Sequence, residues 1–212
     1  MRREILVRLL TVGAIALPLV CSAESNIQTT SGQTALAHVD FQITIPKFLF
    51  LQVGSGSSYA TGVYTANATI DQITWNLTTA NVGTGPIAGT GGVPGPNGTE
   101  LAALVCNSGN AVTFTSTTAG ALNDGAAGDT ISYSNITVAT AGGTFGTLLA
   151  HPLLVDGGTT TTTVNGANHV VKADAKWTYS YTNNTVPAGG VYGGGGAANT
   201  GNGRVTYTAT MP

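Results

Sequence analysis

The longest strand-like run in the chain extends from Ala35 to Val53 and changes character halfway along. Within residues 35–45 the odd positions are apolar, and the even positions from 38 onward are polar. This period of two places the apolar side chains on one face of an extended strand. After Pro46, the run 48–51 is apolar on both faces, as in a strand that is covered from both sides. The pattern predicts an amphipathic strand that continues through a proline into a buried strand.

The rest of the chain consists of short segments that alternate with a strand period and are separated by Gly, Pro, Asn and Asp. No stretch has a helical period, and there is no repeat of fixed length. Strand-like segments are expected at 59–65, 71–79, 100–106, 111–117, 130–138, 144–155, 159–163, 169–183 and 204–212. Long Gly-rich loops are expected at 81–99 and 188–203. The pattern predicts an all-β fold, a β-sandwich with long Gly-rich loops.

Four local features refine this expectation. The turn residues Asn-Ser-Gly-Asn separate 100–106 from 111–117, which predicts a β-hairpin. A phase slip near Asn135 predicts a β-bulge. Pro152 makes 144–155 an edge strand or a bent strand. Trp75 and Trp177 fall inside alternating strands, so both are expected in the core.

The N-terminus has the pattern of a secretory signal peptide, with a basic head, an apolar middle and a small-residue end. Cleavage is expected after Ala23, so residues 1–23 are assigned to the signal peptide. Lipidation at Cys21 would require a small residue before it, and Val20 stands there. Residues 24–46 are interpreted as an N-terminal extension and residues 47–212 as a single domain. The expected location is outside the cell, as a secreted protein.

Charge and cysteine content narrow the function further. Removal of the signal segment takes three of the 7 basic and one of the 9 acidic residues, leaving 4 and 8 and a net charge near −4. A chain without a cationic surface is not expected to bind nucleic acid. The apolar part of the signal segment is too short for a comfortable membrane span, and no later stretch approaches one. Of the 2 cysteines, only Cys106 remains, so no internal disulfide is expected and Cys106 is interpreted as a buried small hydrophobe.

The sequence contains no catalytic motif. His38, His151 and His169 are scattered, with no metal-ligand spacing between them. No bound cofactor and no metal are expected, and the chain is not interpreted as an enzyme. Asn123, Asp124 and Asp129 have the chemistry of calcium ligands, but their spacing matches no known calcium loop, so a plain turn is expected. The tyrosines placed in loops, which are candidates for a sugar-binding platform, are Tyr59, Tyr64 and Tyr192.

Two stretches carry a resemblance to known families. LVCNSGNAVTFT (104–115) is similar to a Val-Cys-Asn-x-Gly-x-x-Val strand, and GGVYGGGG followed by GRVTYTATMP is similar to a Gly-Tyr-x-Gly loop and an alternating last strand. In these features the chain resembles chaperone–usher-type pilins and spore-coat-U-like secreted domains. Those families usually have a second cysteine in the first strand, where this chain has Phe48-Leu49-Phe50. The resemblance implies a location at the bacterial cell surface, reached through the periplasm, and self-association into a fibre, with a periplasmic chaperone and an usher as partners.

The resemblance also implies a role for the first stretch. In such pilins an incomplete immunoglobulin-like sandwich is completed by the N-terminal segment of a neighbour, which is added as a strand. The candidate donor-strand anchors are Ala37, Val39, Phe41, Ile43 and Ile45, with Pro46 as the hinge. Three alternatives stay open. Residues 37–53 form one bent first strand of a complete monomeric sandwich, or the protein is a carbohydrate- or surface-binding module, or it is a hydrolase with an unfamiliar site.

Overall fold

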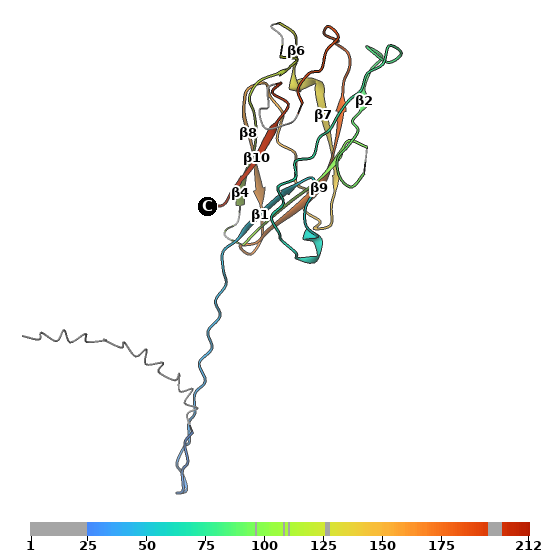
Figure 1. Ribbon diagram of the computed structural model, residues 1–212. Coiled ribbons are helices and arrows are strands. Elements are labelled where there is room, and N and C mark those ends of the chain that lie inside the picture. Colours follow the sequence, from blue (N-terminus) through green and yellow to red (C-terminus); the bar gives the residue numbers. More distant parts are fainter. Residues whose placement is uncertain (1–24, 96, 108, 110, 126–127, 195–200) are drawn as a thin grey trace, which may run out of the picture. The chain divides into compact units, whose positions relative to one another are not determined.

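The computed structural model describes residues 25–95, 97–107, 109, 111–125, 128–194 and 201–212. The expected signal peptide, 1–23, lies outside this part of the chain. Residues Pro46–Pro212 form one compact unit. Among the described residues the regular structure is β-strand and short 3-10 helix, with no α-helix, so the prediction of an all-β fold is confirmed (Figure 1).

The strands make two larger antiparallel sheets and one small one. The five-stranded sheet has the order β1-β3-β9-β2, with β7 also paired to β9; the three-stranded sheet has the order β10-β4-β8; and β5 pairs with β6. The strands are β1 (Leu49–Val53), β2 (Ile87–Ala88), β3 (Thr99–Cys106), β4 (Ala111–Thr118), β5 (Leu122–Asn123), β6 (Thr130–Ile131), β7 (Ile136–Gly142), β8 (Gly158–Asn165), β9 (Val171–Tyr181) and β10 (Val205–Thr210). The 3-10 helices are η1 (Tyr59–Thr61) and η2 (Tyr133–Asn135).

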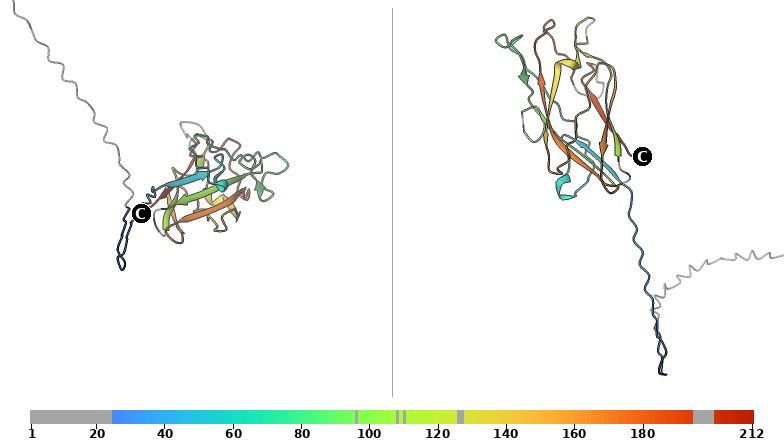
Figure 2. Two further views of the ribbon diagram at one scale, coloured as in Figure 1. Left: turned by 90° about the horizontal axis from the view of Figure 1, so that it is seen from below. Right: turned by 180° about the vertical axis from the view of Figure 1, so that it is seen from behind.

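The two larger sheets enclose a common apolar core, which makes the fold sandwich-like (Figure 2). Phe114 of β4 and Trp177 of β9 stack across the core, with ring centroids 6.0 Å apart. Cys106, at the end of β3, is fully buried in the same cluster, as expected for a small apolar side chain. The alternation in 169–183 also predicted β9 correctly, because Trp177, Tyr179 and Tyr181 all point into the buried side.

The predicted hairpin between 100–106 and 111–117 is wrong. Both segments are strands, but β3 pairs with β1 and β9, whereas β4 pairs with β10 and β8. The turn between them therefore carries the chain from one sheet to the other. The reason is visible in β3, which is buried along almost its whole length and is a central strand with both edges already occupied.

Three other predicted strands are wrong or reduced to single contacts. Residues 59–65 begin with η1 instead of a strand. In 71–79, Thr74 makes one isolated bridge with Thr90. In 144–155, Leu148 makes one isolated parallel bridge with Asp174. The backbone N–H groups of Thr144 and Phe145 donate to the buried Asp174 carboxylate, which competes with a regular sheet ladder.

The predicted bulge near Asn135 is also wrong in kind. The phase slip is the short helix η2, in which the Ser132 side chain accepts a hydrogen bond from the Ser134 N–H. β7 begins directly afterwards, at Ile136.

The long strand predicted over 35–53 forms only in its second half. β1 covers Leu49–Val53, and residues 35–47 are outside any strand and exposed. The amphipathic half has no strand partner within the described part of the chain, so its alternation has no face to bury.

Candidate functional site

The five candidate anchors are the most conspicuous exposed apolar set in the described chain. Val39 is 75%, Phe41 91%, Ile43 86% and Ile45 75% exposed, and Ala37 is exposed as well. Solvent-exposed large apolar side chains in regular alternation are unfavourable in water and commonly mark an interaction segment. The structure leaves all five without a buried environment in the single chain.

A groove lies along one edge of the compact unit. One cavity, of about 300 Å³, lies between β1 and β10 and is lined by Leu51, Val53, Ile70, Arg204, Val205, Thr206 and Tyr207. A second, of about 510 Å³, lies between β1 and the segment 64–69. Both are lined by Leu51 and Val53, so together they form one groove, with β1 as its floor and with β10 and the segment 64–70 as its walls. We call the residues that line these two cavities the edge groove.

The edge groove is where the core is left open. Leu51 and Val53 of β1, and Tyr207 and Ala209 of β10, pack against the buried core but are only partly buried themselves. Within the described residues β1 pairs with β3 alone and β10 pairs with β4 alone, so each strand has one edge without a ladder. A free strand edge presents unpaired N–H and C=O groups.

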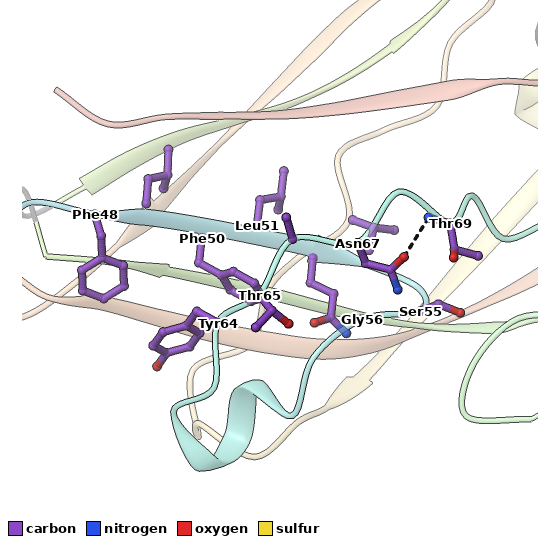
Figure 3. A pocket seen from close by; sticks show the side chains of 13 residues that line it. Phe48, Phe50, Leu51, Ser55, Gly56, Tyr64, Thr65, Asn67 and Thr69 are labelled. Atoms are coloured by element: carbon purple, nitrogen blue, oxygen red, sulfur yellow. Dashed lines mark hydrogen bonds between the residues drawn. The ribbon is translucent and has the colours of Figure 1, made fainter.

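The outer side of β1 carries aromatic side chains. Phe48 and Phe50 lie against Tyr64, with ring centroids 5.6 Å and 5.0 Å apart, and Leu51 points to the other side of the strand (Figure 3). These contacts hold the segment that begins at Tyr64 beside β1, although no backbone hydrogen bond joins the two there.

One wall of the groove is positioned by a buried polar network. The Tyr207 hydroxyl lies 2.6 Å from His151 Nε2 and 3.2 Å from the Tyr179 hydroxyl. The His151 ring stands edge-on to Trp177, with centroids 4.6 Å apart. Burial lowers the pKa of His151 to about 4, so the imidazole is neutral at neutral pH. Burial raises the pKa of Tyr207 well above its ordinary value.

This network predicts an acid-side loss of stability. The unfolded imidazole takes up a proton near pH 6.5 and the folded one only near pH 4, so the unfolded state binds more protons in between. The free energy of unfolding should therefore fall by about 3 kcal/mol as the pH drops through this window. His151→Phe keeps an aromatic ring but cannot titrate. Urea denaturation should show that the free energy of unfolding of this variant does not undergo the fall expected from His151 between pH 6.5 and pH 4. If the free energy of unfolding changed equally with pH in the wild type and in His151→Phe, the prediction would be contradicted.

A carboxyl pair lies at the Val53 end of the groove. Asp71, which follows the groove residue Ile70, accepts hydrogen bonds from the Ser55 N–H and, at 2.8 Å, from the Ser55 hydroxyl. Glu100 at the start of β3 is buried, and its Oε2 has no hydrogen-bond partner among the residues that the structure describes. Burial and the neighbouring Asp71 raise the pKa of Glu100 to about 7. Glu100 therefore retains its proton up to about neutral pH.

The change in the free energy of unfolding with pH that Glu100 causes is opposite in sign to the change that His151 causes. Between pH 4.5 and 7 the folded state holds a proton that the unfolded state has lost, so the free energy of unfolding should fall as the pH rises. Glu100→Gln keeps a hydrogen-bond donor and removes the charge. We expect it to be more stable than the wild type at pH 8 and similar at pH 4.5, measured by urea denaturation. Asp40→Asn is the control. If the free energy of unfolding of the wild type and of Glu100→Gln depended on pH in the same way, the expected role of Glu100 would be contradicted.

The other residues singled out in the sequence lie away from the groove or are occupied structurally. Tyr59 is buried, and its hydroxyl donates to Asp174 Oδ2 at 3.2 Å, so it offers no platform for a sugar. Tyr192 donates to the Ala188 carbonyl. Asn123 accepts a hydrogen bond from the Gly125 N–H, which is turn geometry.

Among the described residues, no cluster of three or more His, Cys, Asp or Glu side chains could hold a metal ion. In the same part of the chain, no helix has the length and apolar character needed to cross a membrane.

Comparison with known proteins gave no relative: no family model, no curated protein and no solved structure matches the chain. Any functional conclusion therefore rests on the geometry of the groove and on the segment 35–45.

Proposed function

We propose that the protein is a secreted structural subunit of a bacterial surface fibre or pilus-like assembly. Neighbouring subunits are joined when residues 37–45 of one copy add as a strand to the edge groove of the next. One observation carries the proposal: the same chain has an alternating apolar segment with no partner and an open sandwich edge with no covering strand.

The two features match in period and chemistry. A strand places alternate side chains about 6.6 Å apart on one face. On β10 and just after it, the half-buried residues Val205, Tyr207, Ala209 and Met211 follow this same period. A strand laid along the free edge of β10 would extend the β10 ladder and direct every second side chain between the two sheets. The odd positions 37–45 supply five apolar side chains for that face.

The energetic gain is large compared with the stability of a domain. Full burial of a Val, Ile or Phe side chain contributes about 1.5–3 kcal/mol. The backbone hydrogen bonds to β10 add to this and fix the direction of the strand, while the alternation fixes the register. Four large anchors are sufficient for a long-lived contact after the cost of ordering the segment.

The order of the strands supports an incomplete immunoglobulin-like sandwich. One sheet runs β1-β3-β9 with β7 beyond it, and the other runs β10-β4-β8, so the open position lies beside the last strand of the chain. A subunit with an open groove requires protection before assembly, which agrees with a periplasmic chaperone and an usher as partners. The expected signal peptide agrees with secretion through the periplasm.

Truncation tests the proposal. The mature chain and a variant without residues 24–45 are compared by size-exclusion chromatography with light scattering and by electron microscopy. We expect assemblies from the mature chain and none from the truncated chain. If both remain monomers of identical behaviour, strand donation is refuted.

A second candidate, a surface-binding module, is favoured by the outer face of the three-stranded sheet. Nine threonines form three cross-strand rows there, with no charged residue among them. The rows are Thr206, Thr117 and Thr159; Thr208, Thr115 and Thr161; and Thr210, Thr113 and Thr163. Neighbouring hydroxyls approach closely, with Thr117 Oγ1 2.8 Å from Thr159 Oγ1. A regular uncharged array of hydroxyl and methyl groups suits an ordered, uncharged surface such as an insoluble polysaccharide.

Binding to insoluble cellulose and chitin separates this candidate from the first. The candidate requires the wild type to sediment with the polymer and Thr115→Lys with Thr161→Lys to lose this binding, while assembly stays unchanged. A wild-type protein that stays in the supernatant refutes it.

A further inference from the structure

The point at which the segment 35–45 joins the domain is held by one side chain. Asn107 follows β3 directly, and its Oδ1 accepts a hydrogen bond from the Phe48 N–H at 2.8 Å. Its Nδ2 donates to the Pro46 carbonyl at 2.6 Å. The Asn107 backbone N–H also donates to the Phe48 carbonyl at 3.4 Å. The amide group therefore holds the chain on both sides of Lys47.

This arrangement continues the β1–β3 ladder beyond its last regular pair, Leu49 with Cys106. The side-chain amide acts as the next peptide group of β3 would, with one acceptor and one donor presented to the incoming strand. The backbone from Pro46 to Phe48 is thereby kept in line with β1, and it cannot turn while both hydrogen bonds are made.

A turn at this point would have a specific consequence. Residues 37–45 are separated from β1 by Pro46, Lys47 and Phe48 alone, and two to five residues are enough for a tight reversal. A segment that reversed there would reach the edge groove of its own domain, where its effective concentration is far above that of any second copy. Such a closed chain would be a monomer that neither gives nor accepts a strand.

The local sequence also opposes a reversal. Two-residue hairpin turns require a positive φ at one or both central residues. Pro46 has its φ fixed near −65° by its ring, and Lys47 has a Cβ that disfavours positive φ. The Asn107 clamp adds two hydrogen bonds to this intrinsic resistance, both of which must break before the chain can turn.

We propose that Asn107 is a positioning residue that keeps the donor segment out of its own groove, so that donation takes place to a second copy of the chain. This inference rests on the proposed function and adds to it the means by which assembly is preferred over self-closure. Asn107 is neither an anchor nor among the residues that line the groove; it acts through its hydrogen bonds to Pro46 and Phe48.

The test uses the full mature chain, refolded by dilution at a series of protein concentrations. Light scattering measures the fraction of monomer, and hydrogen exchange with mass spectrometry measures protection of residues 37–45 within that monomer. The variants are Asn107→Ala with Pro46→Gly, which removes both restraints, and Asn107→Asp, which retains the acceptor for Phe48 and loses the donor to Pro46. Asn165→Ala, on the exposed part of β8, is the control.

Loss of the two hydrogen bonds should raise the monomer fraction about tenfold in Asn107→Ala with Pro46→Gly, with a smaller rise in Asn107→Asp. The monomer should be independent of concentration, and its residues 37–45 should be protected, a result that a misfolded variant would not give. If the wild type assembles and both variants assemble equally well, or if their monomers leave 37–45 unprotected, the inference is overturned while the proposed function stands. A wild type that remains monomeric overturns both.

Discussion

Replacement of Phe41 and Ile43 by aspartate is expected to prevent assembly of the mature chain. Both side chains are among the most exposed in the structure, so the substitutions should leave the folded domain intact. In the edge groove, however, they would place two charges between the sheets, where the lining residues include a single cation, Arg204. A buried unpaired charge costs several kcal/mol, and the burial of two large anchors is lost as well.

The alternation provides a matched control one residue away. Gln42 and Thr44 lie on the polar side of the same segment, and Gln42→Asp with Thr44→Asp adds the same charge to the same stretch. We expect this control to assemble with no more than a few-fold loss. Light scattering at equal concentrations gives the comparison. Equal losses in the odd and even variants would show that the segment acts by charge or length and not by the insertion of alternate side chains.

The second large effect is expected from a peptide added in trans. A synthetic peptide of residues 35–46 should bind the domain that lacks residues 24–45 and raise its melting temperature. At 100 times the dissociation constant the gain is about 2.7 kcal/mol, and for a domain of this size each kcal/mol raises the melting temperature by about 2–4 °C. The expected shift is on the order of 5–10 °C.

The same peptide with Phe41→Asp and Ile43→Asp is the control, and it should produce no shift. If the truncated domain is partly unfolded alone, the wild-type peptide should restore its near-ultraviolet circular dichroism. A wild-type peptide without effect on either property would mean that the groove does not accept this segment.

The sequence predicted those strands whose alternation serves a buried face. β9 is predicted by Trp177 and Tyr179 at alternate positions, and β10 by Val205, Tyr207 and Ala209 at alternate positions. The position of the phase slip before Ile136 is also correct. The pairing of strands was not predictable. The pattern in 100–106 and 111–117 is compatible with a hairpin, and only the burial of β3 on both faces shows that the turn crosses between sheets.

The candidate site, too, was predictable from the sequence only in part. The five anchors were evident from the sequence alone, because they alternate without interruption. The groove was not evident, because it depends on which strands become edges, and this is decided by pairings distant in the sequence. Glu100 had a weak signal as an acidic residue at the head of an apolar strand, whereas nothing in the pattern around His151 indicates its contact with Tyr207.

Because protonation of His151 and protonation of Glu100 change the stability in opposite directions, the pH of these experiments matters. Between pH 4.5 and 6.5 their contributions to the free energy of unfolding change in opposite directions and partly cancel. Measurements near pH 6.5 therefore keep His151 largely neutral while Glu100 is still mostly protonated.

Hydrogen exchange of the assembled protein tests strand donation most directly. Backbone amides of residues 37–45 and of β10 are compared between assembled and monomeric mature chains by mass spectrometry. The account predicts slow exchange in both segments of the assembly and fast exchange of 37–45 in the monomer, since new backbone hydrogen bonds join the two segments. Assemblies in which 37–45 still exchange as fast as an unstructured peptide would contradict it.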